Sequence, residues 1–318
     1  MAANSEQSPS LACDPLACSF SPVWREHPCY AALMITLKHC YPTRCTTLKL
    51  PPGLGDYLRG GIALAHHALE RKWVFELDFS GHPIGKFLDP AANPVASPEA
   101  IDEFFDERAS QIYSWMDRLE DGQVGRACTN LLPHESRITA PVRKAMQDQM
   151  RLNPAILSTA QDTKSRIAGA QQMAVLHVRV PDADFRSLQT TQPALCLAIE
   201  SRVLPIWDRR VAVLSNNPGL RAALCERYGF HLIEAESVHL GACDVSDQAV
   251  RDTLVDFALI CSASHVFSHS AYGWKSGFSY WAAAIHGIAF ESLRAEHTEV
   301  TPVWKQGLKE ALWSLEPR

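Results

Sequence analysis

Arg179 is a natural starting point for the chemistry of this chain, because it stands where an apolar run stops. Met173 to Leu176 are apolar and typical of a buried parallel strand, and the polar residues His177, Arg179 and Asp182 follow them. A guanidinium is always charged and can donate two parallel hydrogen bonds to one phosphate, so Arg179 suits a diphosphate. The alternative is an ordinary salt bridge at the end of the strand.

A second candidate segment is Gly53-Leu54-Gly55-Asp56, which follows a predicted strand and precedes a predicted helix. Its glycines would let the backbone approach a ligand closely and offer amides at the positive end of the helix, or they simply form a tight turn. Asp56 is suited to accept a proton from an attacking hydroxyl, and equally suited to cap the helix.

The same segment is compatible with dinucleotide binding. Asp78 ends the next predicted strand, about where a ribose-binding acid would lie, although Leu58 occupies the position of the third glycine of the dinucleotide fingerprint. A nicotinamide-dependent oxidoreductase that uses Gly53, Gly55 and Asp78 is therefore an alternative hypothesis.

The second half of the chain offers further candidates. Asn216 ends an apolar strand, and Asp256 is an isolated acid in an apolar helix, where it either binds a ribose or base or makes a hydrogen bond within the core. Lys275 and the amides of Ser276 and Gly277 stand before a helix, which predicts a second cradle for phosphate.

The elements that position these residues alternate between strands and helices. The first half is predicted to contain a strand-helix-strand unit, and the region after it is predicted to be helical. In order, the predicted elements are the strand 46–50, the helix 62–72, the strand 73–79 and the helical stretches 99–120 and 141–168. Strands at 173–179, 210–217, 230–235 and 265–270 then alternate with helices at 195–207, 218–229, 249–263 and 278–287. This alternation predicts an α/β protein with parallel, doubly wound sheets.

The length of 318 residues allows two domains, with boundaries expected at 46–168 and 169–292. Residues 1–45 are expected to form a lead-in, and the amphipathic segment 293–318 a helix that packs back on the first domain. A net charge of −5 argues against nucleic acid or an anionic membrane as a partner. With neither a membrane span nor a signal core in the sequence, we expect a cytoplasmic protein whose ten cysteines are mostly free thiols.

Together, HVRVPD, Asp256, the turn SGFSYWAA and the loop GLGDYLRG resemble the GDP-fucose-dependent fucosyltransferase superfamily, of the nodulation α1,6 and protein O-fucosyltransferase kind. The resemblance spans roughly residues 46 to 290. It implies two Rossmann-like domains facing a cleft (GT-B type), with the acceptor side on 46–168 and the nucleotide sugar on 169–292. It also implies transfer of a sugar, with inversion and without metal or cofactor, from a GDP-sugar to a hydroxyl of a glycan, protein or small molecule.

The roles that the resemblance implies are as follows. Arg179 would pair with the departing diphosphate, and Gly53, Gly55 and His177 are assigned to the donor site. The base role of Asp56 is proposed from the chemistry of its carboxylate and not from this resemblance. Asn216 and Asp256 would hold the nucleoside, and Ser276, Gly277 and Phe278 would line the phosphate and sugar pocket. From the residues alone, His82 and Lys86 are candidates for the acceptor side.

Two departures from the family pattern matter. Pro181 stands where the HxRxGD segment of the family has glycine, which removes a backbone donor and fixes φ. In addition, the family commonly has asparagine at the position of Asp56, and GLGD with an acid is also similar to the ADP-heptose glycosyltransferases, whose acid in that loop is taken as the base. An ADP-heptose-type enzyme is therefore a second alternative.

Overall fold

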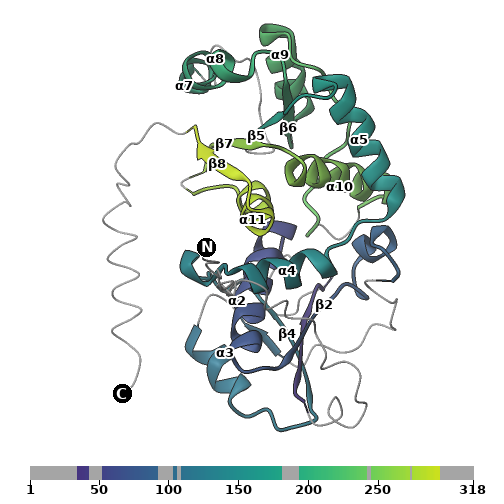
Figure 1. The fold of residues 1–318 in the computed structure, drawn as a ribbon, viewed down its shortest axis with the longest axis vertical. Coiled ribbons are helices and arrows are strands. Elements are labelled where there is room, and N and C mark those ends of the chain that lie inside the picture. Colours follow the sequence, from purple (N-terminus) through teal and green to yellow (C-terminus); the bar gives the residue numbers. More distant parts are fainter. Residues whose placement is uncertain are drawn as a thin grey trace, which may run out of the picture.

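The chain folds into two α/β lobes, each built around a parallel sheet (Figure 1). The computed structural model describes residues 34–42, 52–91, 103–105, 109–180, 193–241, 245–272 and 274–293. The first lobe contains, in chain order, β1 (Thr36–Cys40), α2 (Leu54–Glu70), β2 (Val74–Asp78), the 3₁₀ helix η2 (Pro83–Phe87), β3 (Glu103–Phe105), α3 (Ala109–Met116), β4 (Val124–Thr129), the 3₁₀ helix η3 (Glu135–Arg137), α4 (Ala140–Gln149) and α5 (Pro154–Ala168).

The second lobe begins with the predicted strand that carries Arg179. Its elements, in chain order, are β5 (Ala174–Arg179), α7 (Pro193–Ala198), the π-helical turn η4 (Ile199–Val203), α8 (Leu204–Trp207), β6 (Val211–Ser215), α9 (Pro218–Tyr228), α10 (Asp247–Cys261), β7 (His265–Ser270), α11 (Gly277–His286) and β8 (Ala289–Ser292). The predicted α/β class with parallel sheets is confirmed.

Both sheets are doubly wound. The strand order is β2-β1-β4-β3 in the first lobe and β6-β5-β7-β8 in the second, and all of these pairs are parallel. In each lobe the second strand pairs on one side of the first strand, which is β1 or β5, and a later strand pairs on its other side. In sheets of this kind ligands bind beyond the carboxyl ends of the strands, where the winding direction changes. In the second lobe that point lies between β5 and β7, where Arg179 pairs in register with Ser270.

A shared core joins the two lobes. One hydrophobic cluster contains side chains from α2, α4 and the first sheet together with side chains from α10 and α11. Helix α11 of the second lobe packs against α2 and α4 of the first (Figure 1). A second cluster fills the other face of the second sheet, where Leu176, Val178 and Val213 meet α7 to α9. The alternate residues Val175 and Leu214 face the shared core, as buried parallel strands require.

Several predicted elements differ from the structure. Strand β1 lies within 1–45, the segment expected to be a lead-in, and it is paired on both sides in the first sheet. The predicted strand 46–50 and the predicted helix within 293–318 lie outside the described residues, except Leu293. The predicted helix 99–120 is wrong in part, because it contains the strand β3 as well as α3. Strand β4 was missed, since its sequence VGRACT mixes polar and apolar residues without a clear period.

Helix α2 begins at Leu54 and not at Ile62, so the glycines predicted to form a turn lie inside the helix or cap it. Gly60 and Gly61 allow close packing because they have no side chain. A Cβ on Gly60 would overlap the carbonyl oxygen of Thr129 in β4, and one on Gly61 would touch Met146 of α4. These glycines allow the helix to lie close to the sheet.

The predicted strand 230–235 is wrong. It forms only an isolated bridge between His231 and Ala212. The carbonyl oxygens of Ile233 and Ala235 accept hydrogen bonds from the buried guanidinium of Arg221. Since side chains satisfy this backbone, it needs no neighbouring strand.

Candidate functional site

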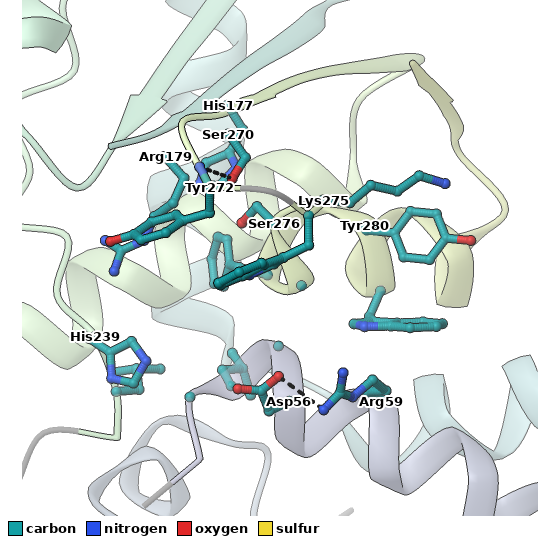
Figure 2. Close-up of a pocket in the computed structure, with 18 of the residues that line it drawn as sticks. Asp56, Arg59, His177, Arg179, His239, Ser270, Tyr272, Lys275, Ser276 and Tyr280 are labelled. Atoms are coloured by element: carbon teal, nitrogen blue, oxygen red, sulfur yellow. Dashed lines mark hydrogen bonds and ion pairs between the residues drawn. The ribbon is translucent and has the colours of Figure 1, made fainter. Parts of the chain in front are cut away.

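A pocket of about 1210 Å³ lies between the lobes, at the carboxyl ends of both sheets. The second lobe contributes residues that follow β5, β6 and β7 and the beginning of α11, and the first lobe contributes the start of α2 and the segment after β4. Figure 2 shows Arg179, Tyr272 and Ser276 on one side of this pocket and Asp56 and Arg59 on the other. The pocket occupies the place that the winding of the second sheet predicts for a ligand.

The residues of this pocket include most of the sequence candidates. Those that line it are Gly53, Gly55, Asp56, His177, Arg179, Asn216, Asp256, Ser276, Gly277 and Phe278. Two other members of the HVRVPD segment, Pro181 and Asp182, lie outside the described residues. The structure therefore brings together side chains that are more than 200 positions apart in the chain.

Arg179 stands at the end of β5, where the strand position fixes its backbone beside Ser270 of β7. Its guanidinium carbon lies 5.8 Å from the ring centroid of Tyr272. Stacking of a guanidinium on an aromatic ring is favourable and helps to fix the orientation of its plane. The first turn of α11, with Ser276 at its N-cap position and Gly277 after it, lines the same wall. The amide groups of that turn are free of helix partners and favour an anion.

His177 is buried and cannot be a charged ligand at neutral pH. Burial, followed by the charges of Arg179 and Arg221, lowers the pKa of His177 to about 3. Its Nδ1 is 2.9 Å from the hydroxyl of Ser279, which is in turn 3.2 Å from the hydroxyl of Ser268. This chain of hydrogen bonds connects β5, β7 and α11 and holds the pocket wall in place.

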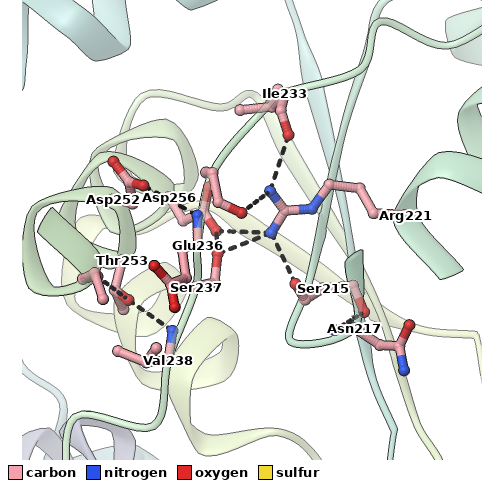
Figure 3. A network of polar contacts seen from close by, with 12 residues as sticks. Ser215, Asn217, Arg221, Ile233, Glu236, Ser237, Val238, Asp252, Thr253 and Asp256 are labelled. Atoms are coloured by element: carbon pink, nitrogen blue, oxygen red, sulfur yellow. Dashed lines mark hydrogen bonds and ion pairs between the residues drawn. The ribbon is translucent and has the colours of Figure 1, made fainter. Parts of the chain in front are cut away.

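Asp256 belongs to a buried polar network (Figure 3). Its Oδ2 accepts from the hydroxyl of Ser237 and lies 3.5 Å from Nη2 of Arg221, and both charged side chains are almost fully buried. Burial raises the pKa of Asp256 to about 6, although Arg221 and Ser237 act in the opposite direction. Among the described residues, the buried Oδ1 of Asp256 has no hydrogen-bond partner, although the residue lines the pocket.

Arg221 is the residue of this network that sequence reasoning missed. It also donates to the carbonyl oxygen of Ser215, at 2.7 Å, and to Ser237, at 2.8 Å. Helix α9 thereby holds the end of β6 and the pocket loop around Ser237 together. The available signal was that Arg221 lies among the apolar positions of α9, where a charge requires partners.

Asn216 holds the backbone next to Arg179. Its side-chain amide donates to the carbonyl oxygen of Val180 at 2.9 Å and accepts from the Val180 amide at 3.1 Å. Asn216 therefore aligns the chain that leaves β5, in addition to lining the pocket.

The first lobe brings Asp56 to the opposite wall. The Asp56 side chain is 48% exposed, and its Oδ1 is 3.5 Å from Nη2 of Arg59, one helical turn further along α2. The second carboxylate on this side is Glu135 of η3, which accepts a hydrogen bond from the hydroxyl of Tyr280 in α11. Glu135 was missed because the strand that precedes it was missed.

Gly55 marks the closest approach of the two walls. A Cβ at this position would overlap the backbone of Gly277 and Phe278 at the start of α11. A Cβ on Gly53 would likewise lie too close to the ring of His239. Gly55 therefore allows the starts of α2 and α11 to meet, and Gly53 leaves room for His239. These are packing roles that the sequence alone did not distinguish from ligand binding.

His82 and Lys86, the candidates for the acceptor side, are absent from the pocket lining within the described part of the chain. The Nε2 of His82 is 2.7 Å from the carbonyl oxygen of Leu240, and Lys86 forms an ion pair with Asp247 at 2.8 Å. Both side chains therefore connect η2 of the first lobe to the second lobe.

Asp78, the acid of the oxidoreductase hypothesis, is also absent from the described lining. Its Oδ1 accepts from the backbone amide and the hydroxyl of Ser80. The five cysteines that the structure describes carry free thiols, as expected. Among the described residues there is no cluster of three metal-binding side chains. Of the described helices, none has the length and apolar character to cross a membrane.

Comparison with known proteins gives a likeness of fold. No protein-family model and no curated protein matches the sequence. Among solved structures, the chain is similar to NodZ α-1,6-fucosyltransferase soaked with GDP-fucose, with 13% identity over 79% of this chain and 92% of that chain and a TM-score of 0.51. Fucosyltransferase NodZ from Bradyrhizobium matches with 13% identity over 78% and 92%, with a TM-score of 0.48.

A third solved structure is a mutant of Arabidopsis thaliana FUT1 in complex with GDP, which is 10% identical over 85% of this chain and 73% of that chain, with a TM-score of 0.44. At these identities the similarity concerns the fold. It agrees with the resemblance carried by HVRVPD, Asp256, SGFSYWAA and GLGDYLRG. The chain therefore has the two-lobed α/β fold of NodZ α-1,6-fucosyltransferase.

Proposed function

We propose that the protein is a glycosyltransferase that moves a sugar, fucose or a close relative, from a GDP-sugar to a hydroxyl acceptor. The observation that carries the proposal is the arrangement around the pocket. Arg179 and the first turn of α11 meet at the switch point of the second sheet, and Asp56 faces them from the first lobe. The solved structure of the same fold was soaked with GDP-fucose, which supports this choice of donor.

In the proposed reaction the acceptor oxygen forms a bond to the anomeric carbon of the sugar. The bond from that carbon to the diphosphate oxygen breaks, and its electron pair leaves with GDP. Arg179 and the α11 amides stabilise the negative charge that develops on the diphosphate. The proton of the acceptor hydroxyl goes to the carboxylate of Asp56.

Inversion and metal independence are part of the same proposal. One displacement, with the acceptor and the diphosphate on opposite faces of the sugar, inverts the anomeric carbon. Arg179, Lys275 and the helix amides supply positive charge of the kind that a cation would otherwise supply. We expect the product to have the inverted configuration by NMR and transfer to continue in EDTA. Loss of transfer in EDTA that magnesium restores would contradict this part.

The donor is tested by thermal shift with GDP, UDP, ADP and NAD. A ligand at one hundred times its Kd stabilises the folded state by about 2.7 kcal/mol, so binding is readily seen. We expect GDP to raise the Tm most. Stabilisation by ADP alone would indicate the ADP-heptose type, and stabilisation by NAD alone would indicate an oxidoreductase.

Arg179→Ala tests the leaving-group role. Removing a donor to a developing oxyanion typically lowers kcat by about 10²–10³-fold. We expect the rate of acceptor-dependent GDP release to fall by about the same factor. The matched control is Arg227→Ala, since Arg227 is an arginine outside the pocket that pairs with Glu200. Transfer by Arg179→Ala at the rate of this control would refute the assignment.

Asp56→Asn tests the base. The substitution keeps the size of the side chain and removes its capacity to take the proton, so kcat should fall while GDP affinity is retained. Unchanged turnover at saturating substrate would leave Asp56 with a structural role at the start of α2.

A further inference from the structure

Trp274 is an exposed tryptophan at the pocket between the lobes. Its side chain is 62% exposed, whereas Trp115, Trp207 and Trp281 are all buried. Large aromatic side chains contribute most to stability or binding when they are buried, so an indole that is exposed on a pocket wall is a candidate binding surface. Trp274 belongs to none of the motifs that predicted the site.

The indole is held in place by Tyr272. The two rings are stacked, with centroids 5.4 Å apart and planes at 22°. The other neighbour of Tyr272 is the guanidinium of Arg179, at 5.8 Å. Figure 2 shows Tyr272 beside Arg179 on the wall opposite Asp56. Because the rings support one another, a ligand that stacks on them needs to order little further side-chain motion.

The strand order separates this aromatic pair from the nucleoside side of the pocket. Asn216 follows β6, Arg179 ends β5, and Tyr272 and Trp274 follow β7, and these strands are adjacent in the order β6-β5-β7. A nucleotide sugar with its diphosphate at Arg179 and its nucleoside near Asn216 therefore points its sugar toward the β7 side. The aromatic pair lies on that same side of Arg179.

The charges around the pair are mixed. Asp56 and Glu135 are acidic, Arg59 and Lys275 are basic, and all four line the pocket. Together with Arg179, which is assigned to the diphosphate, these groups offer many hydrogen-bond donors and acceptors. A pyranose ring presents C–H groups on its faces and hydroxyls along its edge, which fits an aromatic plane bordered by polar groups.

We propose that Tyr272 and Trp274 form the subsite that binds a sugar ring of the acceptor, so that the acceptor is a glycoside or oligosaccharide. This inference rests on the proposed function, because it assigns the acceptor of the same pocket.

The test is saturation-transfer NMR of the full chain in the presence of GDP. The probes are methyl β-glucoside, methyl β-galactoside and methyl N-acetyl-β-glucosaminide, with sorbitol and a serine- and threonine-containing tetrapeptide for comparison. We expect ring C–H protons of at least one glycoside to receive saturation, and neither sorbitol nor the peptide to do so. Trp274→Ala should weaken glycoside binding at least tenfold, and Trp274→Phe, which keeps an aromatic plane, should retain most of it.

The control variant is Ile206→Ala, since Ile206 is 64% exposed on α8 and lies outside the pocket. It should bind GDP and glycoside like the wild type, and Trp274→Ala should change the Kd for GDP by less than about twofold. Equal glycoside binding by Trp274→Ala, an equal loss of GDP affinity, or binding of the peptide alone would overturn the proposal. A wild-type protein that does not bind GDP would instead refute the proposed function, and this inference with it.

Discussion

The contact between Gly55 and Gly277 allows a sharp test of how the two lobes form the pocket. In Gly55→Ala the new methyl group would overlap backbone atoms of Gly277 and Phe278, which cannot rotate out of the way as a side chain can. Overpacking of this kind costs about 1–3 kcal/mol. Alanine in a helix regains up to about 1 kcal/mol over glycine, and less in the first turn. We therefore expect a net loss of about 1–2 kcal/mol in the free energy of unfolding.

The loss of activity should exceed the loss of stability. Relief of the overlap separates the start of α2 from the start of α11, which moves Asp56 away from the wall that holds the donor. A misplacement of about 1 Å can lower a rate by about 10²-fold, so kcat for transfer should fall by up to this factor while GDP binding changes less.

Gly277→Ala is the matched control across the same contact. A Cβ on Gly277 would lie 3.4 Å from the nearest atom of Gly55, which is an ordinary van der Waals distance. We expect this variant to be as stable as the wild type. Urea unfolding compares the midpoints of the variants, provided that the m-values agree. Wild-type stability and turnover in Gly55→Ala, or an equal loss of stability in both variants, would refute the packing argument.

Three further predictions concern buried polar groups. Arg221→Met should destabilise the fold by about 3–5 kcal/mol because it leaves Asp256 buried without its cation. Burial already raises the pKa of Asp256, so this loss should be larger at pH 8, where the carboxylate is charged, than at pH 5. An equal loss at the two pH values would contradict this prediction. His82→Ala should lower the free energy of unfolding by about 1–3 kcal/mol, because the carbonyl oxygen of Leu240 loses its hydrogen-bond partner. Leu240 lies on the pocket loop, so GDP binding should weaken as well. Calorimetry measures the first effect and GDP titration the second. Burial lowers the pKa of His39 to about 4. Between pH about 6.5 and pH about 4, the unfolded state therefore binds a proton that the folded state does not bind. As the pH falls through this range, the free energy of unfolding should decrease by up to ~1.4 kcal/mol per pH unit. His39→Phe should flatten this pH dependence in urea unfolding, and an unchanged slope would show that His39 is not its source.

Much of the second lobe was predictable from local pattern. The apolar run that ends at Arg179 is β5, and the periodic apolar residues around Asp256 form α10. Parallel strands end at one edge of a sheet, so the predicted strands 173–179 and 265–270 were expected to end at the same edge. The structure shows that they are also neighbours, with Arg179 paired with Ser270. The predicted strand 230–235 failed for a reason that local pattern does not contain, because Arg221 satisfies its carbonyl groups from another element.

The first lobe was harder to predict because its strands are short and partly polar. Strand β4 carries Arg126 between its apolar residues, and β3 has only three residues, so neither shows a clear period. Missing β4 meant missing Glu135, which follows it into the pocket. His82 was predicted to reach a ligand, and its partner Leu240 could not be inferred across 158 positions of sequence.

Local pattern was enough to identify the residues that end the strands of the second lobe, and with them the chemistry that gathers at one edge of the sheet. Periodicity and strand direction are local properties, and they were enough to bring Arg179, Ser276 and Asp256 to one pocket. Local pattern does not show which residues face this edge from the first lobe, nor what each side chain contacts. Gly55 touches Gly277, Asp256 contacts Arg221, and the exposed Trp274 stacks on Tyr272. These contacts depend on how two lobes and distant helices pack, which is a property of the whole chain.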